Sequence, residues 1–148
     1  MIQLAALRKA QTPSRVIYTA RTHTTGGREN GVARSSDGRL NIMLALPGSS
    51  RGGANPEQLF AAGWSACFEG ALGLAARRKR IRLPADMAID AEVDLLLDGG
   101  EYFLSARLNV ALPGLERGVA QSLVEDAEWL CPFAKATRGN IAVTYNVV

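Results

Sequence analysis

The sequence predicts an α+β protein in which antiparallel sheets pack around one long, buried central helix. The first observation is that residues 55–79 are apolar or small at nearly every position up to Ala76. A helix that is apolar on almost all of its faces belongs in the interior of a fold. The second observation is that segments typical of strands stand in clusters before and after the helices, which favours mainly antiparallel pairing.

The chain before the central helix is predicted to form three strands. β-branched residues and partial alternation of apolar and polar residues mark these segments. Asp37-Gly38 is a favoured hairpin turn between the second and third strands, whereas the glycine pair and Asn30-Gly31 predict a loop over residues 26–30. The strands are expected at residues 15–24, 32–36 and 40–46, followed by a flexible connection at residues 47–54.

The central helix has a marked start. Asn55 can cap it, Pro56 suits the first helical position, and Gln58 completes a capping box with Asn55. Three glycines interrupt the helix, and each weakens a helix interior by roughly 1 kcal/mol, so we expect another backbone to approach closely. These glycines are Gly63, Gly70 and Gly73.

The chain after the central helix is predicted to form a second cluster of strands and one amphipathic helix. Asp98-Gly99-Gly100 supplies the turn between two long strand-like segments. Apolar residues recur at helical spacing from Leu115 to Ala127, which predicts a helix with one apolar face. The expected elements are strands at residues 87–97, 102–111 and 140–148 and a helix at residues 113–130.

Length and composition indicate one globular domain. The chain has 148 residues and 47% apolar content, which is enough for a sizeable core. We expect a single domain over residues 15–148, preceded by an N-terminal extension over residues 1–14. The first fifteen positions carry three basic residues and no acidic one, a pattern that a loose extension explains as well as a targeting segment does.

Several protein classes are disfavoured. The net charge of +3 is too small to imply a nucleic-acid partner. No uninterrupted apolar run reaches the ~18 residues that a membrane span requires, so no membrane association is expected. Two cysteines are too few for a disulfide-stabilised secreted domain, and no signal-peptide pattern opens the chain, which together predict a reducing cytoplasmic location.

The two cysteines are candidates for chemistry, and each also has a plain structural interpretation. Cys67 lies in the apolar helix, where a cysteine is most often a small packing residue. Cys131 precedes Pro132 and therefore suits a helix start, where the helix dipole favours the thiolate. Their spacing excludes the C-x-x-C pattern of thioredoxin-like and zinc sites. On these residues alone, both interpretations stay open.

The charged residues are similarly ambiguous when they are taken singly. Arg28 in the glycine-rich loop is by default a solvated charge, and Glu57 by default complements the dipole of the helix that it opens. His23 is the only histidine and would have no partners as a metal ligand, so no metal site is expected. The basic run at residues 77–80 is better explained by the end of the helix than by nucleic-acid binding.

Three stretches considered together are more specific: TGGRENG from Thr25, NPEQLFAAGWSACFEGAL from Asn55 and CPFAKATRGN from Cys131. In this order they resemble the organic hydroperoxide resistance (Ohr) proteins of the OsmC/Ohr superfamily, and the likeness extends from about Val16 to the C-terminus. The Gly-Gly-Arg loop and the CPF ending are more similar to the Ohr branch than to the OsmC branch. Trp64 departs from the family, which typically has tyrosine there, and could reshape the substrate pocket.

The resemblance implies a thiol-dependent peroxidase that forms an intertwined homodimer. Cys67 would match the attacking cysteine and Cys131 the cysteine that resolves its sulfenic acid to a disulfide. Arg28 and Glu57 would match the pair that activates the first thiol. The implied reductant is a dithiol, the lipoyl group of a carrier protein, and no cofactor is implied. Apolar neighbours of the thiol suit an alkyl or fatty-acyl hydroperoxide, and the candidate substrate-binding residues are Phe60, Trp64, Phe68 and Phe133.

The chemistry agrees with these roles. Only a thiolate attacks an O–O bond well, and a free thiol with a pKa of about 8.5 is mostly protonated at neutral pH. Arg28 stays charged at any relevant pH, and Glu57 can hold its guanidinium through a bidentate contact. The alternatives are an OsmC-type peroxidase with a different peroxide preference, or a non-enzymatic module that binds a hydrophobic ligand or senses oxidation.

The spacing of Glu57 and Cys67 poses a geometric problem. Ten residues on one straight helix separate them by roughly 15 Å along the axis and by about 80° around it. Either the helix breaks near Gly63, or Arg28 and Glu57 approach the Cys67 of a partner chain. The second solution is preferred, because one small sheet cannot easily cover so apolar a helix, and two such helices could pack through their glycines.

Overall fold

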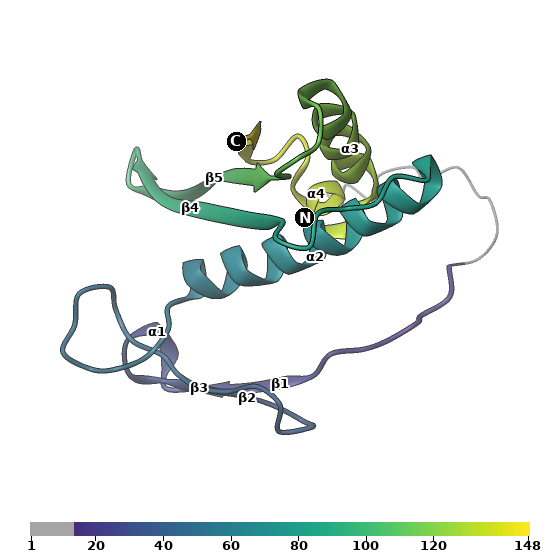
Figure 1. Cartoon of the computed structure of the whole chain (residues 1–148). Helices are drawn as coiled ribbons and strands as arrows, with labels where there is room; N and C mark the ends of the chain where they lie inside the picture. The colour runs from purple at the N-terminus through teal and green to yellow at the C-terminus, as the bar shows by residue number, and fades with distance from the viewer. Residues whose placement is uncertain (1–13) are drawn as a thin grey trace.

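The computed structural model describes residues 14–148. All but the last residue of the predicted extension, residues 1–14, therefore lies outside the described residues, and the domain boundary stays a prediction. Two three-stranded sheets lie on either side of the long helix α2 in Figure 1. The elements in chain order are β1 (Thr22–Thr25), α1 (Gly27–Asn30), β2 (Val32–Ser35), β3 (Asn41–Met43), α2 (Pro56–Lys79), β4 (Ala88–Asp98), β5 (Glu101–Ala111), α3 (Arg117–Leu130), α4 (Pro132–Thr137) and β6 (Ala142–Val147).

The N-terminal sheet has the order β1-β2-β3, and both of its pairings are antiparallel. The predicted hairpin turn at Asp37-Gly38 is confirmed, with Gly38 in the left-handed region at φ +73°. The first strand is shorter than predicted, because β2 offers partners only to residues 22–25. The predicted loop at residues 26–30 is wrong, since residues 27–30 form the one-turn helix α1.

The second sheet has the order β4-β5-β6. β4 and β5 form the predicted antiparallel hairpin, paired from Ala88↔Ala111 to Asp98↔Glu101. β6 runs parallel to β5, so the pairing is mainly antiparallel, as predicted, with this one exception. The helices α3 and α4 lie between these two strands in the chain, and such a crossover returns the chain to the sheet in the same direction.

Helix α2 is continuous from Pro56 to Lys79 and begins as predicted. The Asn55 side chain accepts from the N–H of Gln58 at 2.8 Å, and the Gln58 side chain accepts from the N–H of Asn55 at 3.0 Å. One face of α2 packs on α3 and β4 and contributes to the core, in which Trp64, Phe68 and Leu72 are fully buried. The predicted central helix and α+β class are confirmed.

Another face of α2 is not covered by any part of residues 14–148. Ala62, Ala66 and Gly70 on this face are exposed, and a Cβ added to Gly70 would meet no atom within 4 Å. By length and composition alone, α2 could cross a membrane, which corrects the expectation that no segment would qualify. Core helices of globular proteins pass the same test, and α2 packs on α3, α4 and β4.

Candidate active site

The fold brings the two cysteine sulfurs together. Cys67 lies in the middle of α2, and Cys131 lies at the junction of α3 and α4. The two Sγ atoms are 3.5 Å apart, and the Cys131 thiol donates to the Cys67 sulfur. Both are free thiols, with Cys67 half-buried and Cys131 buried. The separation is larger than the ~2 Å of a disulfide, but a small side-chain movement could close it.

Cys131 is held by both helices that meet at it. Its N–H donates to the carbonyl oxygen of Ala127 at 2.8 Å, and its own carbonyl oxygen accepts from the N–H of Lys135 at 3.0 Å. The predicted helix start at Pro132 is confirmed. The expected preference for the thiolate is wrong: burial raises the pKa of the Cys131 thiol, despite opposing hydrogen bonds from the backbone of Ala134 and Phe133.

Aromatic side chains lie along α2 on both sides of Cys67 in the sequence and pack against rings from α4 and β6. The ring of Phe60 lies 5.4 Å from that of Trp64 and 6.1 Å from that of Phe133 between centroids. Phe68 is stacked at 5.1 Å on Tyr145, a β6 residue that sequence reasoning missed because nothing in its strand marks it. Burial, together with the nearby Glu128 and Cys131, raises the pKa of Tyr145 to about 12.

The four predicted substrate-binding residues fall into two groups in one chain. Trp64 and Phe68 are fully buried core residues, whereas Phe60 and Phe133 are half-buried and accessible from the surface. Within residues 14–148, the indole Nε1 of Trp64 is the only buried side-chain nitrogen or oxygen that lacks a hydrogen-bond partner. Their role in substrate binding stays a prediction.

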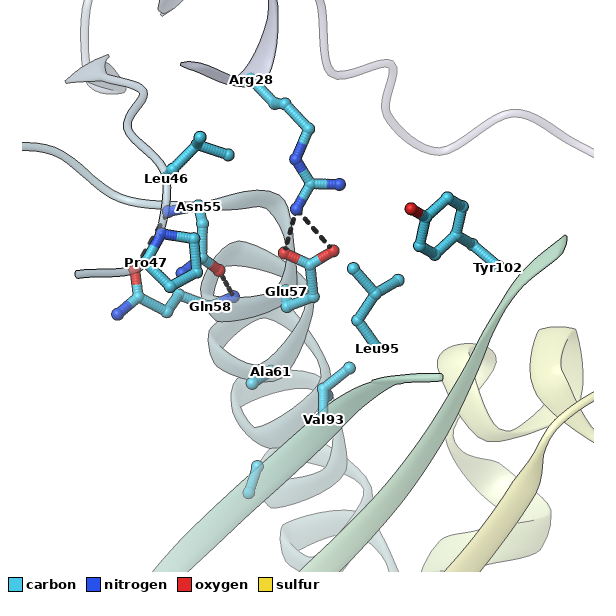
Figure 2. Close-up of a pocket in the computed structure, with 11 residues that line it drawn as sticks. Arg28, Leu46, Pro47, Asn55, Glu57, Gln58, Ala61, Val93, Leu95 and Tyr102 are labelled. Atoms are coloured by element: carbon cyan, nitrogen blue, oxygen red, sulfur yellow. Dashed lines mark hydrogen bonds and ion pairs between the residues drawn. The ribbon is translucent and has the colours of Figure 1, made fainter. Parts of the chain in front are cut away.

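Arg28 and Glu57 form an ion pair within one chain. The Arg28 Nη2 donates to Glu57 Oε2 at 2.8 Å and to Oε1 at 3.0 Å, as Figure 2 shows. The Arg28 side chain is 41% exposed and that of Glu57 16%. The predicted contact with both carboxylate oxygens is present, but a single guanidinium nitrogen makes it. Within the described residues, Nε and Nη1 therefore have no hydrogen-bond partner and can face another group.

The turn that carries Arg28 depends on glycine. Gly26 and Gly27 have φ values of +75° and +68°, a region that other residues rarely adopt. A Cβ added to Gly26 would lie 2.9 Å from the Cα of Gly31, so the two ends of the turn are in contact. The tight turn directs Arg28 toward the first turn of α2, where Glu57 lies.

A cavity of about 700 Å³ opens beside this ion pair. Its walls are mostly apolar, and in Figure 2 the hydroxyl of Tyr102 points toward Arg28. Neither cysteine lines it. Sequence reasoning missed the wall from the β4–β5 hairpin, although alternation along β4 places residues 91, 93 and 95 on one face. The lining residues are Arg28, Leu46, Pro47, Asn55, Glu57, Gln58, Ala61, Ala91, Val93, Leu95 and Tyr102.

The unbroken helix keeps the ion pair away from the thiol of the same chain. Because α2 is continuous through Gly63, the predicted alternative of a helix break there is wrong. Glu57 and Cys67, ten residues apart, are therefore separated by roughly 15 Å along the axis. One chain thus presents two half-sites: a thiol pair among aromatic rings, and an ion pair in an apolar cavity.

The part of the chain that the structure describes contains no candidate metal site. Among residues 14–148, no group of three or more His, Cys, Asp or Glu side chains could hold a metal ion. His23 lies on the exposed strand β1, paired with Arg34.

Comparison with known proteins identifies the class to which this fold and these two cysteines belong. The family model described as OsmC-like protein matches residues 48–146. The chain belongs to this OsmC-like family.

Individual relatives show which members of this family the chain is similar to. It is 43% identical over 137 residues to the organic hydroperoxide resistance protein of Xanthomonas axonopodis pv. citri, covering 90% of this chain and 96% of that one. It is 41% identical over 141 residues to OhrA of Bacillus subtilis, covering 90% and 98%. The crystal structure of OhrB of Bacillus subtilis superimposes with a TM-score of 0.84 at 38% identity, covering 90% and 100%. The resemblance to the organic hydroperoxide resistance proteins is confirmed, and it supports a role in resistance to organic hydroperoxides.

Proposed function

We propose that the chain is a thiol-dependent peroxidase that reduces organic hydroperoxides to alcohols. The observation that carries the proposal is the 3.5 Å contact between Cys67 Sγ and Cys131 Sγ, made by residues 64 positions apart in the sequence. Two thiols at this distance can pass between the dithiol and disulfide states without rearranging the fold. The names of the relatives supply the substrate class.

The two cysteines take different roles because their environments differ. Cys67 is half-buried and can be reached by a substrate, whereas Cys131 is buried and its raised pKa keeps the thiol protonated. The Cys67 thiolate attacks one peroxide oxygen, forming an S–O bond while the O–O bond breaks, and the alkoxide leaves as the alcohol after taking a proton. The resulting sulfenic acid condenses with the Cys131 thiol, forming the disulfide and releasing water.

An external dithiol then reduces the disulfide, so each cycle converts one hydroperoxide and one dithiol into an alcohol, water and a disulfide. We propose lipoyl groups on a carrier protein as this dithiol, as the family resemblance implies. No resident cofactor takes part, since sulfur carries both electrons. We place this cycle in the cytoplasm, where thiols are kept reduced.

The apolar surroundings favour organic peroxides over hydrogen peroxide. Phe60, Phe133 and Cys67 all pack against the same hydrophobic core, and Leu46, Pro47, Val93 and Leu95 are among the residues that line the cavity beside Arg28. Burying an alkyl chain against such walls contributes roughly 25 cal/mol per Å² of apolar surface removed from water. Hydrogen peroxide has no alkyl chain and gains none of this stabilisation.

The complete site requires a second copy of the chain. The ion pair and the thiol of one chain are too far apart to act on one oxygen, so we propose that Arg28 and Glu57 approach the partner's Cys67. Two features support a homodimer: the small-residue face of α2 is uncovered, and large apolar side chains at the end of the β4–β5 hairpin are exposed. These side chains are Leu95, Leu96, Leu97, Tyr102 and Phe103.

Peroxide consumption by cysteine variants tests the proposal. The unsubstituted protein should consume tert-butyl hydroperoxide with dihydrolipoamide as reductant and should consume hydrogen peroxide much more slowly. Cys67→Ser should abolish turnover. Cys131→Ser should consume about one equivalent and leave a sulfenic acid on Cys67 that dimedone traps. Reaction of Cys67→Ser with peroxide while Cys131→Ser stays inert would show that the assigned roles are reversed.

A further inference from the structure

Arg51 lies in the connection between β3 and α2, and its side chain reaches the turn that carries Arg28. Its Nη2 donates to the carbonyl oxygen of Asn30 at 3.3 Å, and its Nε donates to the carbonyl oxygen of Leu44 at 3.3 Å. Asn30 is the last residue of α1, and Leu44 directly follows β3. One half-buried side chain thus joins three separate segments of the backbone.

The contact on Asn30 falls where the Arg28 turn closes on itself. A Cβ added to Gly26 would lie 3.1 Å from the same carbonyl oxygen, so this oxygen lies between the start and the end of the turn. The neighbouring Gly31 is bonded to the residue that follows β3, because its carbonyl oxygen accepts from the N–H of Leu44 at 2.8 Å. Arg51 therefore bonds to the turn that carries Arg28 at the point where the two ends of that turn are in contact.

The Arg51 guanidinium has no other engagement in the described part of the chain. Residues 14–148 contain no ion pair of Arg51, and both of its hydrogen bonds go to backbone carbonyl oxygens. It does not line the cavity beside Arg28. A planar guanidinium can donate to two carbonyl oxygens at once from fixed directions, which a lysine ammonium does less well.

We propose that Arg51 is a positioning residue that holds the Arg28 turn against the start of α2. The inference rests on the proposed peroxidase function. Arg28 meets Glu57 across 29 positions of sequence, and the Arg51 contacts fix the backbone on the Arg28 side of that ion pair. A guanidinium held in one orientation stabilises a neighbouring thiolate and the peroxide oxygens without reorganising in each cycle.

The test compares Arg51→Ala, Arg51→Lys and the unsubstituted protein. Arg51→Ala should lower kcat/KM for tert-butyl hydroperoxide about threefold to tenfold, since misplacing a charged group weakens transition-state contacts. The pH midpoint of Cys67 thiolate formation, followed by alkylation rate, should rise in the same variant. Arg51→Lys should restore part of both. Arg39→Ala is the matched control, because this arginine is 90% exposed on the β2–β3 turn and should behave as the parent.

A double substitution separates positioning from general stabilisation. If Arg51 acts through Arg28, Arg28→Ala/Arg51→Ala should be no less active than Arg28→Ala alone. Additive losses, or an Arg51→Ala protein with the parent's kcat/KM and thiolate midpoint, would overturn the inference. Absence of peroxide consumption in the parent would refute the proposed function instead. The thiolate midpoint would still decide the role of Arg51 in that case.

Discussion

Complementation between two inactive variants tests whether the active site spans two chains. One chain carries Cys67→Ser and keeps Glu57, and the other carries Glu57→Ala and keeps Cys67. Unfolding and refolding a mixture produces both homodimers and the heterodimer. If Glu57 acts across the interface, the heterodimer contains one site in which an intact Cys67 meets an intact Glu57.

The magnitude follows from the geometry of α2. A guanidinium and a thiolate 4 Å apart interact by about 4 kcal/mol at an effective dielectric constant of 20. At the roughly 15 Å that separates Glu57 from Cys67 along the helix, the interaction falls to about 1 kcal/mol before salt screening. Screening over a Debye length of about 8–10 Å reduces it further. The cross-chain proposal therefore predicts that the ion pair of one chain activates the Cys67 of its partner and contributes little to its own.

Random mixing of equal amounts gives heterodimers in about half of the molecules, each with one working site of two. The mixture should therefore recover about a quarter of the parent's turnover with tert-butyl hydroperoxide and dihydrolipoamide. The control is the same mixture without the unfolding step. Native mass spectrometry should confirm that heterodimers form. If they form and activity stays at the mean of the two variants, the cross-chain site is refuted.

Two further predictions concern the same residues. Arg28→Lys can keep one nitrogen on Glu57 but lacks the further N–H groups that face away from the carboxylate. The value of kcat/KM should therefore fall about 10- to 100-fold, as expected for one lost charge-assisted hydrogen bond. Kinetics like those of the parent would show that the forked shape of the guanidinium plays no part in the mechanism. Burial raises the pKa of Cys131 above the ordinary value of about 8.5, so its thiolate is scarce at neutral pH and increases with pH. In single turnovers, competition between dimedone and Cys131 for the sulfenic acid gives the rate of disulfide formation. This rate should still increase with pH above about 8.5, and a rate that becomes constant below that pH would show that the pKa of Cys131 is not raised.

Local features were predictable from the sequence alone. The start of α2 depends on Asn55, Pro56 and Gln58, which act within one helical turn of each other. The two capping hydrogen bonds and the position of the proline all occur as expected. The β4–β5 hairpin follows from alternation and a glycine turn, which are equally local. The motifs around Cys67 and Cys131 indicated the family because each is a short, continuous stretch.

The tertiary structure shows how distant groups meet. The family resemblance implied that Arg28 pairs with Glu57 and Cys67 with Cys131, whereas the contact of Arg51 with Asn30 came from the structure alone. The contacts of Arg28 with Glu57, Arg51 with Asn30, and Cys131 with Cys67 join residues 29, 21 and 64 positions apart. No periodicity or capping rule reaches across such separations, because their formation depends on how whole elements pack. The pKa of Cys131 shows the same division: its place at a helix start was readable locally and favours the thiolate. The burial that reverses this preference comes from the packing of α2, α3 and α4 around the sulfur.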